Sequence, residues 1–331
     1  MSNQAIADFW LWWAENRPRV LAGLHDQDAD WVRVFSEKIA AIDPALEWEF
    51  GRGRDAAHHL AVSATGDPRL RVLAEKWRAR GPAPDEAFEF HCSRQRMPSS
   101  PMEAAIRFGD LHLDYAGLGF EVTIDDHVQR FHVVCRHPTL DAIPEEHRLR
   151  VVYVMLDNLL GEDALETWVG DIAVESSNTE CVEVNAQELQ SLVDSAHPRW
   201  PEHNWVVAQA TEPESGQTLV YTGMASAKYL RAPLFDTMCV ARLPYAPQDG
   251  GMPASEDLAR VDGFHRVVED RLQDEVMVLW RRTGAGERML WMALMADNGP
   301  GRTALEALAE GHPGHVELTF SWDPGWRSLP L

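Results

Sequence analysis

The last predicted strand of this sequence constrains the fold most, because its side chains alternate without a break. Between His315 and Trp322 every second residue is apolar, and the residues between them are polar. A period of two is typical of a strand that has one buried face and one face in water. Such a strand fits a sheet edge, where the charge of Glu317 discourages pairing with a second copy. The preceding chain must supply a layer that covers the apolar face.

The segments before this strand predict that layer. Their expected elements are a helix at residues 255–272, paired strands at 275–280 and 287–295, and a helix at 303–309. Ser255 is a candidate N-cap of the first of these helices, because its hydroxyl can accept a hydrogen bond from a free backbone N–H. The order helix, hairpin, helix, strand favours an antiparallel sheet that is covered on one side by helices.

Four short motifs in this region resemble those of a known family. They are Asp249-Gly250-Gly251-Met252-Pro253, Val268-Glu269-Asp270, Arg282-Thr283-Gly284 and Asp323-Pro324-Gly325-Trp326. Through their order and spacing, residues 200–331 resemble the bacterial "domain of unknown function 695" family, although Trp291 and Met292 stand where we expect Phe or Tyr. Domains of that family are sometimes found beside domains similar to the regulator of ribonuclease E activity B. The family assigns no catalytic residue, so the resemblance implies a fold and no activity.

The preceding 198 residues also mix helical and strand patterns. The expected helices are residues 6–24, 31–42, 68–80, 145–160 and one that ends at 197–198; the expected strands are 46–50, 59–64, 88–92, several within 104–135, and 172–175. Pro18 is expected to kink or end the first helix. Asp67 is a candidate N-cap, and Asn185 with Glu188 forms a capping-box pattern.

These patterns together predict an α+β protein of two domains, residues 1–198 and 199–331. Each is expected to be a mainly antiparallel sheet with helices packed on one face, an arrangement compatible with ferredoxin-like sandwiches. The helix at 145–160 is expected to bury Leu149, Val152, Tyr153, Leu156 and Leu160.

The net charge limits the classes of partner. The chain has 30 Lys and Arg residues against 52 Asp and Glu residues, which gives −22 at pH 7. A field of this sign repels phosphate backbones, so we do not expect direct nucleic-acid binding. The same field steers basic protein surfaces toward the chain, although acidity also serves solubility alone.

Other sequence features point to a cytoplasmic protein. Four widely spaced cysteines without a CxxC pattern fit a reducing compartment. We find neither a signal-peptide pattern nor an 18-residue apolar run, so no membrane partner is expected.

No strong catalytic motif is present, and we expect no metal and no cofactor. Cys135 and His137 share a face if their strand continues that far, but the chain lacks HExxH and CxxC patterns. Asp114 and Glu121 could face each other across a hairpin as paired carboxylates; two acids on the wet face of a strand are usually solvated.

Five residues are candidates for interaction: Trp12, Glu269, Asp270, Asp323 and Trp326. The aromatic run around Trp12 fits a helix that docks into its own domain, and it also fits an indole that anchors a partner. Surface salt bridges offer a simple explanation of Glu269 and Asp270.

Three functions remain open. The favoured one is a non-enzymatic, acidic module that binds and regulates another protein, with a basic protein as the partner. The second is an enzyme whose site is assembled from scattered polar residues. The third is a small-molecule-binding protein with a Trp-lined pocket between its two domains.

Overall fold

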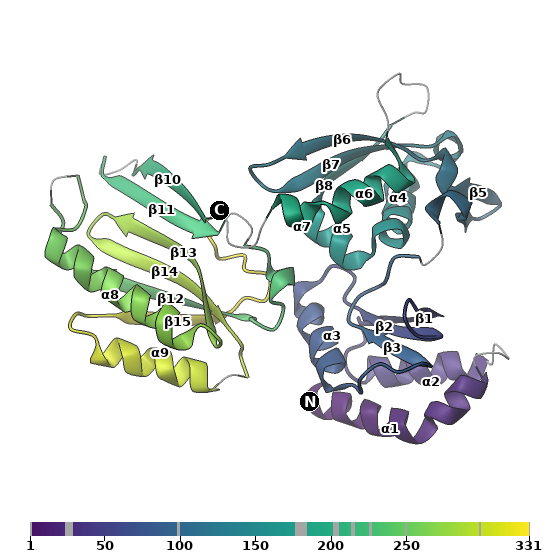
Figure 1. The fold of residues 1–331 in the computed structure, drawn as a ribbon, viewed down its shortest axis with the longest axis horizontal. Coiled ribbons are helices and arrows are strands. Elements are labelled where there is room, and N and C mark those ends of the chain that lie inside the picture. Colours follow the sequence, from purple (N-terminus) through teal and green to yellow (C-terminus); the bar gives the residue numbers. More distant parts are fainter. Residues whose placement is uncertain are drawn as a thin grey trace. The chain divides into compact units, whose positions relative to one another are not determined.

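The computed structural model describes most of the chain. The described residues are 2–23, 29–97, 100–175, 184–200, 205–212, 216–224, 227–248, 250–297 and 299–330. They form two compact units, Met1–Arg199 and Trp200–Leu331 (Figure 1). Cys181 and Asp249, which entered the sequence arguments, lie outside the described residues.

The first unit begins with three helices on a small sheet (Figure 1). The helices are α1 (Ser2–Gly23), α2 (Ala29–Ala40) and α3 (Pro68–Arg80); the strands are β1 (Glu47–Arg52), β2 (His58–Ser63) and β3 (Phe88–His91). β2 pairs with β1 antiparallel and with β3 in parallel, because α3 carries the chain back across the sheet. Aromatic rings fill the layer between helices and strands, with Trp10 stacked on Trp77 at 4.7 Å between ring centroids.

Of the helix signals in this part, the cap at Asp67 is confirmed and the stop at Pro18 is not. α3 begins and ends where its pattern predicts, and the Asp67 side chain accepts a hydrogen bond from Arg69 N. Pro18 does not end α1, since the helix runs through it to Gly23. Tertiary packing explains this, because Trp13 before the proline and Val20 after it are both buried in the same core.

The remainder of the first unit has its own sheets. Its strands are β4 (Ala105–Phe108), β5 (Leu111–Asp114), β6 (Gly119–Asp125), β7 (Arg130–Arg136), β8 (Val169–Val174) and β9 (Val184–Asn185); its helices are α4 (Glu145–Leu160), α5 (Glu162–Trp168), α6 (Ala186–Asp194) and α7 (Ala196–Arg199), with short 3₁₀ turns η1 (Pro101–Glu103), η2 (Tyr115–Gly117) and η3 (Pro138–Ala142). The strand orders are β4-β5 and β8-β7-β6-β9. The capping box of Asn185 and Glu188 is confirmed at the start of α6.

The α+β class is confirmed, but the expectation of one sheet for this part is wrong. The described residues of the first unit form three separate sheets. Helical crossovers join β2 to β3 and β7 to β8, and both pairs are parallel, so these strands do not form one antiparallel sheet.

Helix α4 has the predicted length and a different buried face. Leu149 is 44% exposed and Tyr153 is 46% exposed. The residues that α4 buries are Val151, Val152, Met155, Leu156, Leu159 and Leu160. Apolar residues occur on more than one face of this helix, so their spacing alone did not identify the inner one.

The strands among the described residues of the second unit form one six-stranded sheet. Its elements are β10 (Trp205–Thr211), β11 (Thr218–Met224), η4 (Tyr229–Arg231), β12 (Thr237–Pro244), α8 (Ser255–Leu272), β13 (Val276–Gly284), β14 (Glu287–Leu294), α9 (Gly299–Gly311) and β15 (Glu317–Trp322). The order is β10-β11-β13-β14-β12-β15, and every pair is antiparallel.

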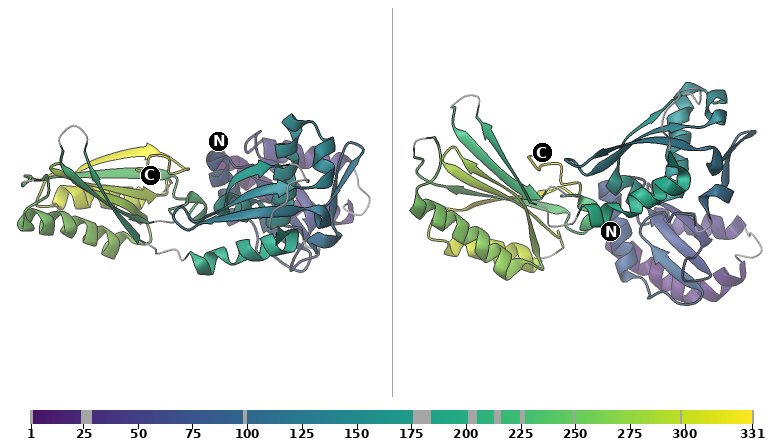
Figure 2. Two further views of the ribbon diagram at one scale, coloured as in Figure 1. Left: turned by 90° about the horizontal axis from the view of Figure 1, so that it is seen from above. Right: turned by 45° about the horizontal axis from the view of Figure 1, so that its top comes forward.

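From β12 to β15 the connectivity of the second unit is that of a ferredoxin-like fold, extended by the β10–β11 hairpin. Both α8 and α9 lie on one face of the sheet (Figure 2). The predicted edge position of β15 is confirmed. Ser255 is not the N-cap of α8; Ala254 holds that position without a side-chain hydrogen bond.

Strand β10 forms the other edge of this sheet and carries no charged residue. Val207 is 71% exposed there. None of the described helices is long and apolar enough to cross a membrane.

Candidate functional site

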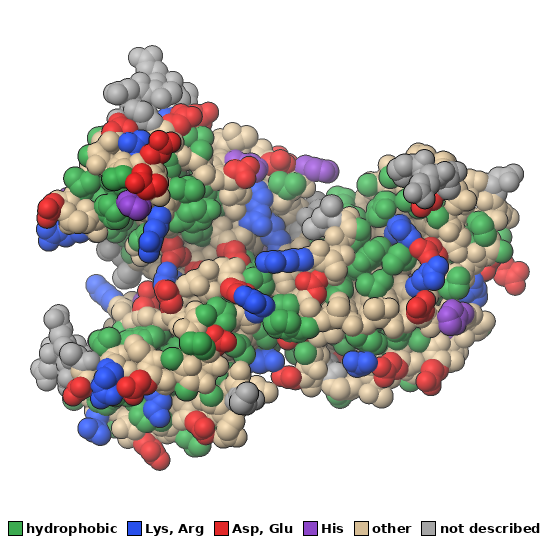
Figure 3. Space-filling model, turned by 180° about the vertical axis from the view of Figure 1, so that it is seen from behind, with side chains coloured by type: hydrophobic (Ala, Val, Ile, Leu, Met, Phe, Trp, Pro, Cys, Tyr) green, Lys and Arg blue, Asp and Glu red, His purple; other side chains and the backbone are tan. Residues whose placement is uncertain are grey.

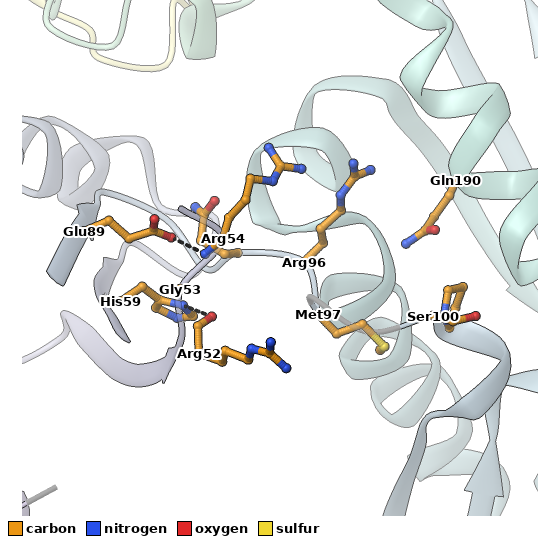
Figure 4. Close-up of a pocket in the computed structure, with 11 residues that line it drawn as sticks. Arg52, Gly53, Arg54, His59, Glu89, Arg96, Met97, Ser100 and Gln190 are labelled. Atoms are coloured by element: carbon orange, nitrogen blue, oxygen red, sulfur yellow. Dashed lines mark hydrogen bonds between the residues drawn. The ribbon is translucent and has the colours of Figure 1, made fainter. Parts of the chain in front are cut away.

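A cavity of about 480 Å³ lies in the first unit and is lined by basic and polar side chains. We name it the arginine cavity, after Arg52, Arg54 and Arg96. Figure 4 shows the loop after β1 on one side of it, and Ser100 and Gln190 on the other. The segment with Arg96 and Met97 runs between these two sides. Three separate stretches of the sequence therefore build one site.

The carboxylate of Glu89 shapes the loop that carries Arg54. It accepts hydrogen bonds from the backbone N–H groups of Arg54, Asp55 and Ala56, at 2.8, 3.0 and 3.2 Å. Burial alone would raise the pKa of Glu89, but these hydrogen bonds and one from His91 outweigh it and lower the pKa to about 2. The loop is thus held by a charged group that is only 7% exposed.

Glycine is required at two positions of this wall. A Cβ on Gly53 would lie 2.5 Å from the carbonyl oxygen of Ala56, and a Cβ on Gly51 would lie 2.3 Å from the ring of His59. Gly51 and His59 are directly paired across β1 and β2. The absence of a side chain at Gly51 lets the imidazole lie across the strand.

His59 is a second titratable group of this wall. Its Nδ1 lies 3.1 Å from the carbonyl oxygen of Arg52, and its Nε2 lies 3.4 Å from the carboxylate of Glu49. Burial lowers the pKa of His59, but the hydrogen bonds to Glu49 and Arg52 outweigh it, so that the pKa is raised overall. The imidazolium form therefore adds positive charge to the wall at mildly acidic pH.

The three arginines differ in their partners. Arg96 lies 3.0 Å from both carboxylate oxygens of Asp194. Within the described part of the chain, the guanidinium groups of Arg52 and Arg54 form no ion pair, and both residues are exposed. The cavity therefore presents two guanidinium groups whose N–H donors are available to a ligand.

The arginine cavity was not predicted from the sequence, although a signal is present. Arg52-Gly53-Arg54 and Arg94-Gln95-Arg96 are two Arg-x-Arg patterns in segments that follow strands. Their convergence depends on the parallel pairing of β2 with β3, which the spacing did not predict.

Trp12 is half-buried in the aromatic core of the first unit. Its ring packs edge-on against Phe35 at 5.2 Å between centroids, and Lys38 Nζ lies 5.6 Å from its ring centroid. In the second unit, Glu269 lies 3.2 Å from His265 Nε2 on α8, and Asp270 is exposed. The interaction role of these residues stays a prediction.

The other two candidates shape the C-terminal turn. Asp323 accepts hydrogen bonds from the backbone N–H groups of Arg327 and Ser328, both at 2.9 Å. Trp326 is 4% exposed, and its indole N–H donates to the carbonyl oxygen of Phe235 at 2.8 Å. Both residues therefore make contacts within the chain itself. Their role in binding a partner stays a prediction.

The carboxylate pair considered for Asp114 and Glu121 does not form. Asp114 ends β5 and accepts a hydrogen bond from Gly117 N, whereas Glu121 lies on β6 and pairs with Arg136 at 3.1 Å. The two strands belong to different sheets, because the η2 turn separates them. His137 bonds the carbonyl oxygen of Asp114, and among the described residues no group of three or more His, Cys, Asp or Glu could hold a metal ion.

The surface charge is mixed. Figure 3 shows acidic and basic side chains interspersed over the face drawn there. The net charge of −22 is therefore compatible with locally basic sites such as the arginine cavity.

No protein-family model matches the chain, and no curated protein matches it significantly.

Proposed function

We propose that the chain is a non-enzymatic regulatory module whose first unit binds a small phosphorylated molecule in the arginine cavity. The observation that carries this proposal is that Arg52 and Arg54 line one cavity and that neither guanidinium group forms an ion pair with another described residue. Guanidinium groups bind phosphate oxygens through paired N–H donors, which gives both charge and direction to the contact.

The size of the cavity and its far wall support the same class of ligand. Its volume of about 480 Å³ falls within the range of about 300 to 1,000 Å³ that is usual for small-molecule sites. Ser100 and Gln190 line the side opposite Arg52, and their polar groups can bind hydroxyls on the body of a ligand.

The net charge of the chain and the local charge of the arginine cavity act on anions of different size. A long polyanion meets the field of the whole chain, and the net charge of −22 repels it. A small phosphate in the cavity meets mainly the nearby guanidinium groups, because salt screens charges beyond about 8 to 10 Å. The proposal therefore keeps the prediction that nucleic acid is not a partner.

Titration of the full-length chain with pyrophosphate at low salt tests this function by calorimetry. We expect one saturable site whose affinity falls as salt rises. The double variant Arg52→Gln/Arg54→Gln should bind at least about 30-fold more weakly, since each charge-assisted contact contributes roughly 1.5 to 3 kcal/mol.

The matched control is Arg107→Gln/Arg150→Gln. This pair removes the same charge from two other exposed arginines of the first unit, neither of which lines the arginine cavity. Equal loss of affinity in both double variants, or no saturable binding to the unmodified chain, would contradict the proposal.

A basic protein partner is the second proposal. It rests on the excess of 52 acidic over 30 basic residues, which favours encounter with a basic surface. Affinity capture from the source lysate followed by a salt gradient tests it. A stoichiometric basic protein that salt releases supports it, and a chain that retains no protein at low salt refutes it. The family resemblance and the cytoplasmic location also stay predictions.

A further inference from the structure

A second cavity of the first unit has a lining of the opposite kind. Its volume is about 420 Å³, and Asp157 and Glu162 contribute carboxylates to its wall. We name it the carboxylate cavity. Its apolar lining residues are Tyr153, Val154, Leu165, Val169 and Ile172.

The apolar side of the carboxylate cavity is unusually open to solvent. Tyr153 is 46% exposed and Val154 is 48% exposed. Both residues lie on the face of α4 that points away from its buried stripe. A ligand with an apolar body would remove this surface from water, which is favourable through the hydrophobic effect.

The acidic side contains a carboxylate oxygen without a donor. Glu162 is 6% exposed, and its Oε2 accepts a hydrogen bond from Arg94 N at 2.8 Å. Its Oε1 is buried and has no hydrogen-bond partner among the described residues. A buried carboxylate oxygen without a donor is stabilised by positive charge nearby.

Carboxylates also outnumber cations here. Arg94 Nη1 lies 3.3 Å from Asp157 Oδ2, but the same guanidinium group also pairs with Glu47 and lies 3.9 Å from Glu49. Glu162 is the fourth acid around this one arginine. A further positive charge would therefore be stabilised near Asp157.

We propose that the carboxylate cavity binds an organic cation, with a primary ammonium group between Asp157 and Glu162 and an apolar body against Tyr153 and Val154. The ammonium group offers three N–H donors and a compact charge, which suit two carboxylates. An anion would be repelled by the acids, and a neutral apolar molecule would leave their charge uncompensated. This proposal does not depend on the function of the arginine cavity.

Benzylamine and benzyl alcohol provide a matched pair of probes for the full-length chain. Both carry the same aromatic body, and only the amine is a cation at pH 7.5. We expect calorimetry to show benzylamine binding at least about tenfold more tightly than benzyl alcohol. Equal affinities, or no binding of benzylamine, would overturn the proposal.

Variants locate the binding site. Asp157→Asn should weaken benzylamine at least about tenfold and leave benzyl alcohol unchanged. Glu146→Gln is the control, since it removes one exposed carboxylate from the first turn of the same helix and does not line the cavity. Glu162→Gln is a second test, and the circular dichroism of each variant shows whether it is folded. If both folded cavity variants bind the amine as well as the unmodified chain does, the site is wrong.

The pH dependence of binding gives an independent readout. Burial raises the pKa of Asp157 to about 6, with Arg94 opposing this and Glu162 and Glu49 adding to it. Tyr115 is also a titratable group near Asp157. Since the amine stays protonated throughout, its affinity should be about tenfold lower at pH 5 than at pH 7.5. A flat profile would contradict the role of Asp157.

Discussion

The arginine cavity and the carboxylate cavity are separated by one short segment and have opposite character. Residues 94–97 follow β3, and Arg94 lines the carboxylate cavity while Arg96 lines the arginine cavity. Arg94 is surrounded by acids from several elements, and Arg96 pairs with Asp194. Two arginines of one Arg-x-Arg pattern thus have different functions in the fold.

This difference shows that the excess of acidic or basic groups around a side chain, more than its own charge, decides which charge of ligand a site favours. Around Arg94 the acids are in excess, so the local field favours a cation. The guanidinium groups of Arg52 and Arg54 form no ion pair with another described residue, and they outnumber the carboxylate of Glu89 in the cavity wall, so the local field favours an anion. The net charge of −22 describes neither site.

The largest expected effect comes from breaking the wall of the arginine cavity. Glu89→Ala removes the acceptor of three backbone N–H groups. The lowered pKa of Glu89, about 2 against 4.5, corresponds to a loss of about 3 kcal/mol in the free energy of unfolding at pH 7. Urea denaturation measures it.

The pH dependence of the same contact sharpens this test. A carboxylate with a lowered folded-state pKa stabilises the fold above its unfolded pKa, and the contribution disappears as the pH falls toward 2. The difference between the chain and Glu89→Ala should therefore shrink between pH 4.5 and pH 2. A difference that does not change with pH would show that the carboxylate charge is not what holds the loop.

A smaller effect on the free energy of unfolding, a gain instead of a loss, is expected when the charge of Asp157 is removed from the carboxylate cavity. Asp157 has a raised folded-state pKa, so the folded state binds its proton more tightly than the unfolded state does. Stability is then lost as the pH rises from 3.8 to about 6. Asp157→Asn should stabilise the ligand-free chain by about 2 kcal/mol at pH 8; the raised pKa already includes the contact with Arg94, and the asparagine still leaves a polar group to bury.

The gain from Asp157→Asn should vanish below pH 4, where the carboxyl group of the unmodified chain is also neutral. Thermal unfolding at pH 4 and pH 8 measures both values. Destabilisation by Asp157→Asn at pH 8 would mean that the ion pair with Arg94 outweighs the cost of burying the charge.

The smallest effect on stability is expected for the residues that matter most for the proposed function. Arg52 and Arg54 are exposed, and no ion pair to another described residue restrains them. The variant Arg52→Gln/Arg54→Gln should change the free energy of unfolding by no more than about 0.5 kcal/mol. A loss above about 1 kcal/mol would indicate a structural role for these arginines and would weaken the contrast between the two cavities.

The sequence predicts elements well where local chemistry determines them. The helix at Pro68–Arg80 and the helix at Glu145–Leu160 have the predicted bounds, and Asp67 and Asn185 cap their helices as expected. Each of these signals acts within a few residues, so neighbouring segments do not change it.

The sites were not predictable in the same way. Arg52, Arg96 and Gln190 come together only through the pairing of β2 with β3 and the placement of α6. The exposure of Tyr153 likewise depends on which apolar face of α4 meets the core. Spacing along the chain contains neither kind of information, because both depend on contacts between segments that are distant in sequence.

The uncharged edge strand β10 has a consequence for colloidal behaviour. Its backbone groups on the outer side are a template for pairing with another chain, and natural edge strands usually carry charges that prevent this. Here the repulsion between molecules of net charge −22 provides the protection at a distance. Salt shortens the range of that repulsion. Concentrated preparations should therefore resist aggregation in dilute buffer and lose that resistance as salt is added.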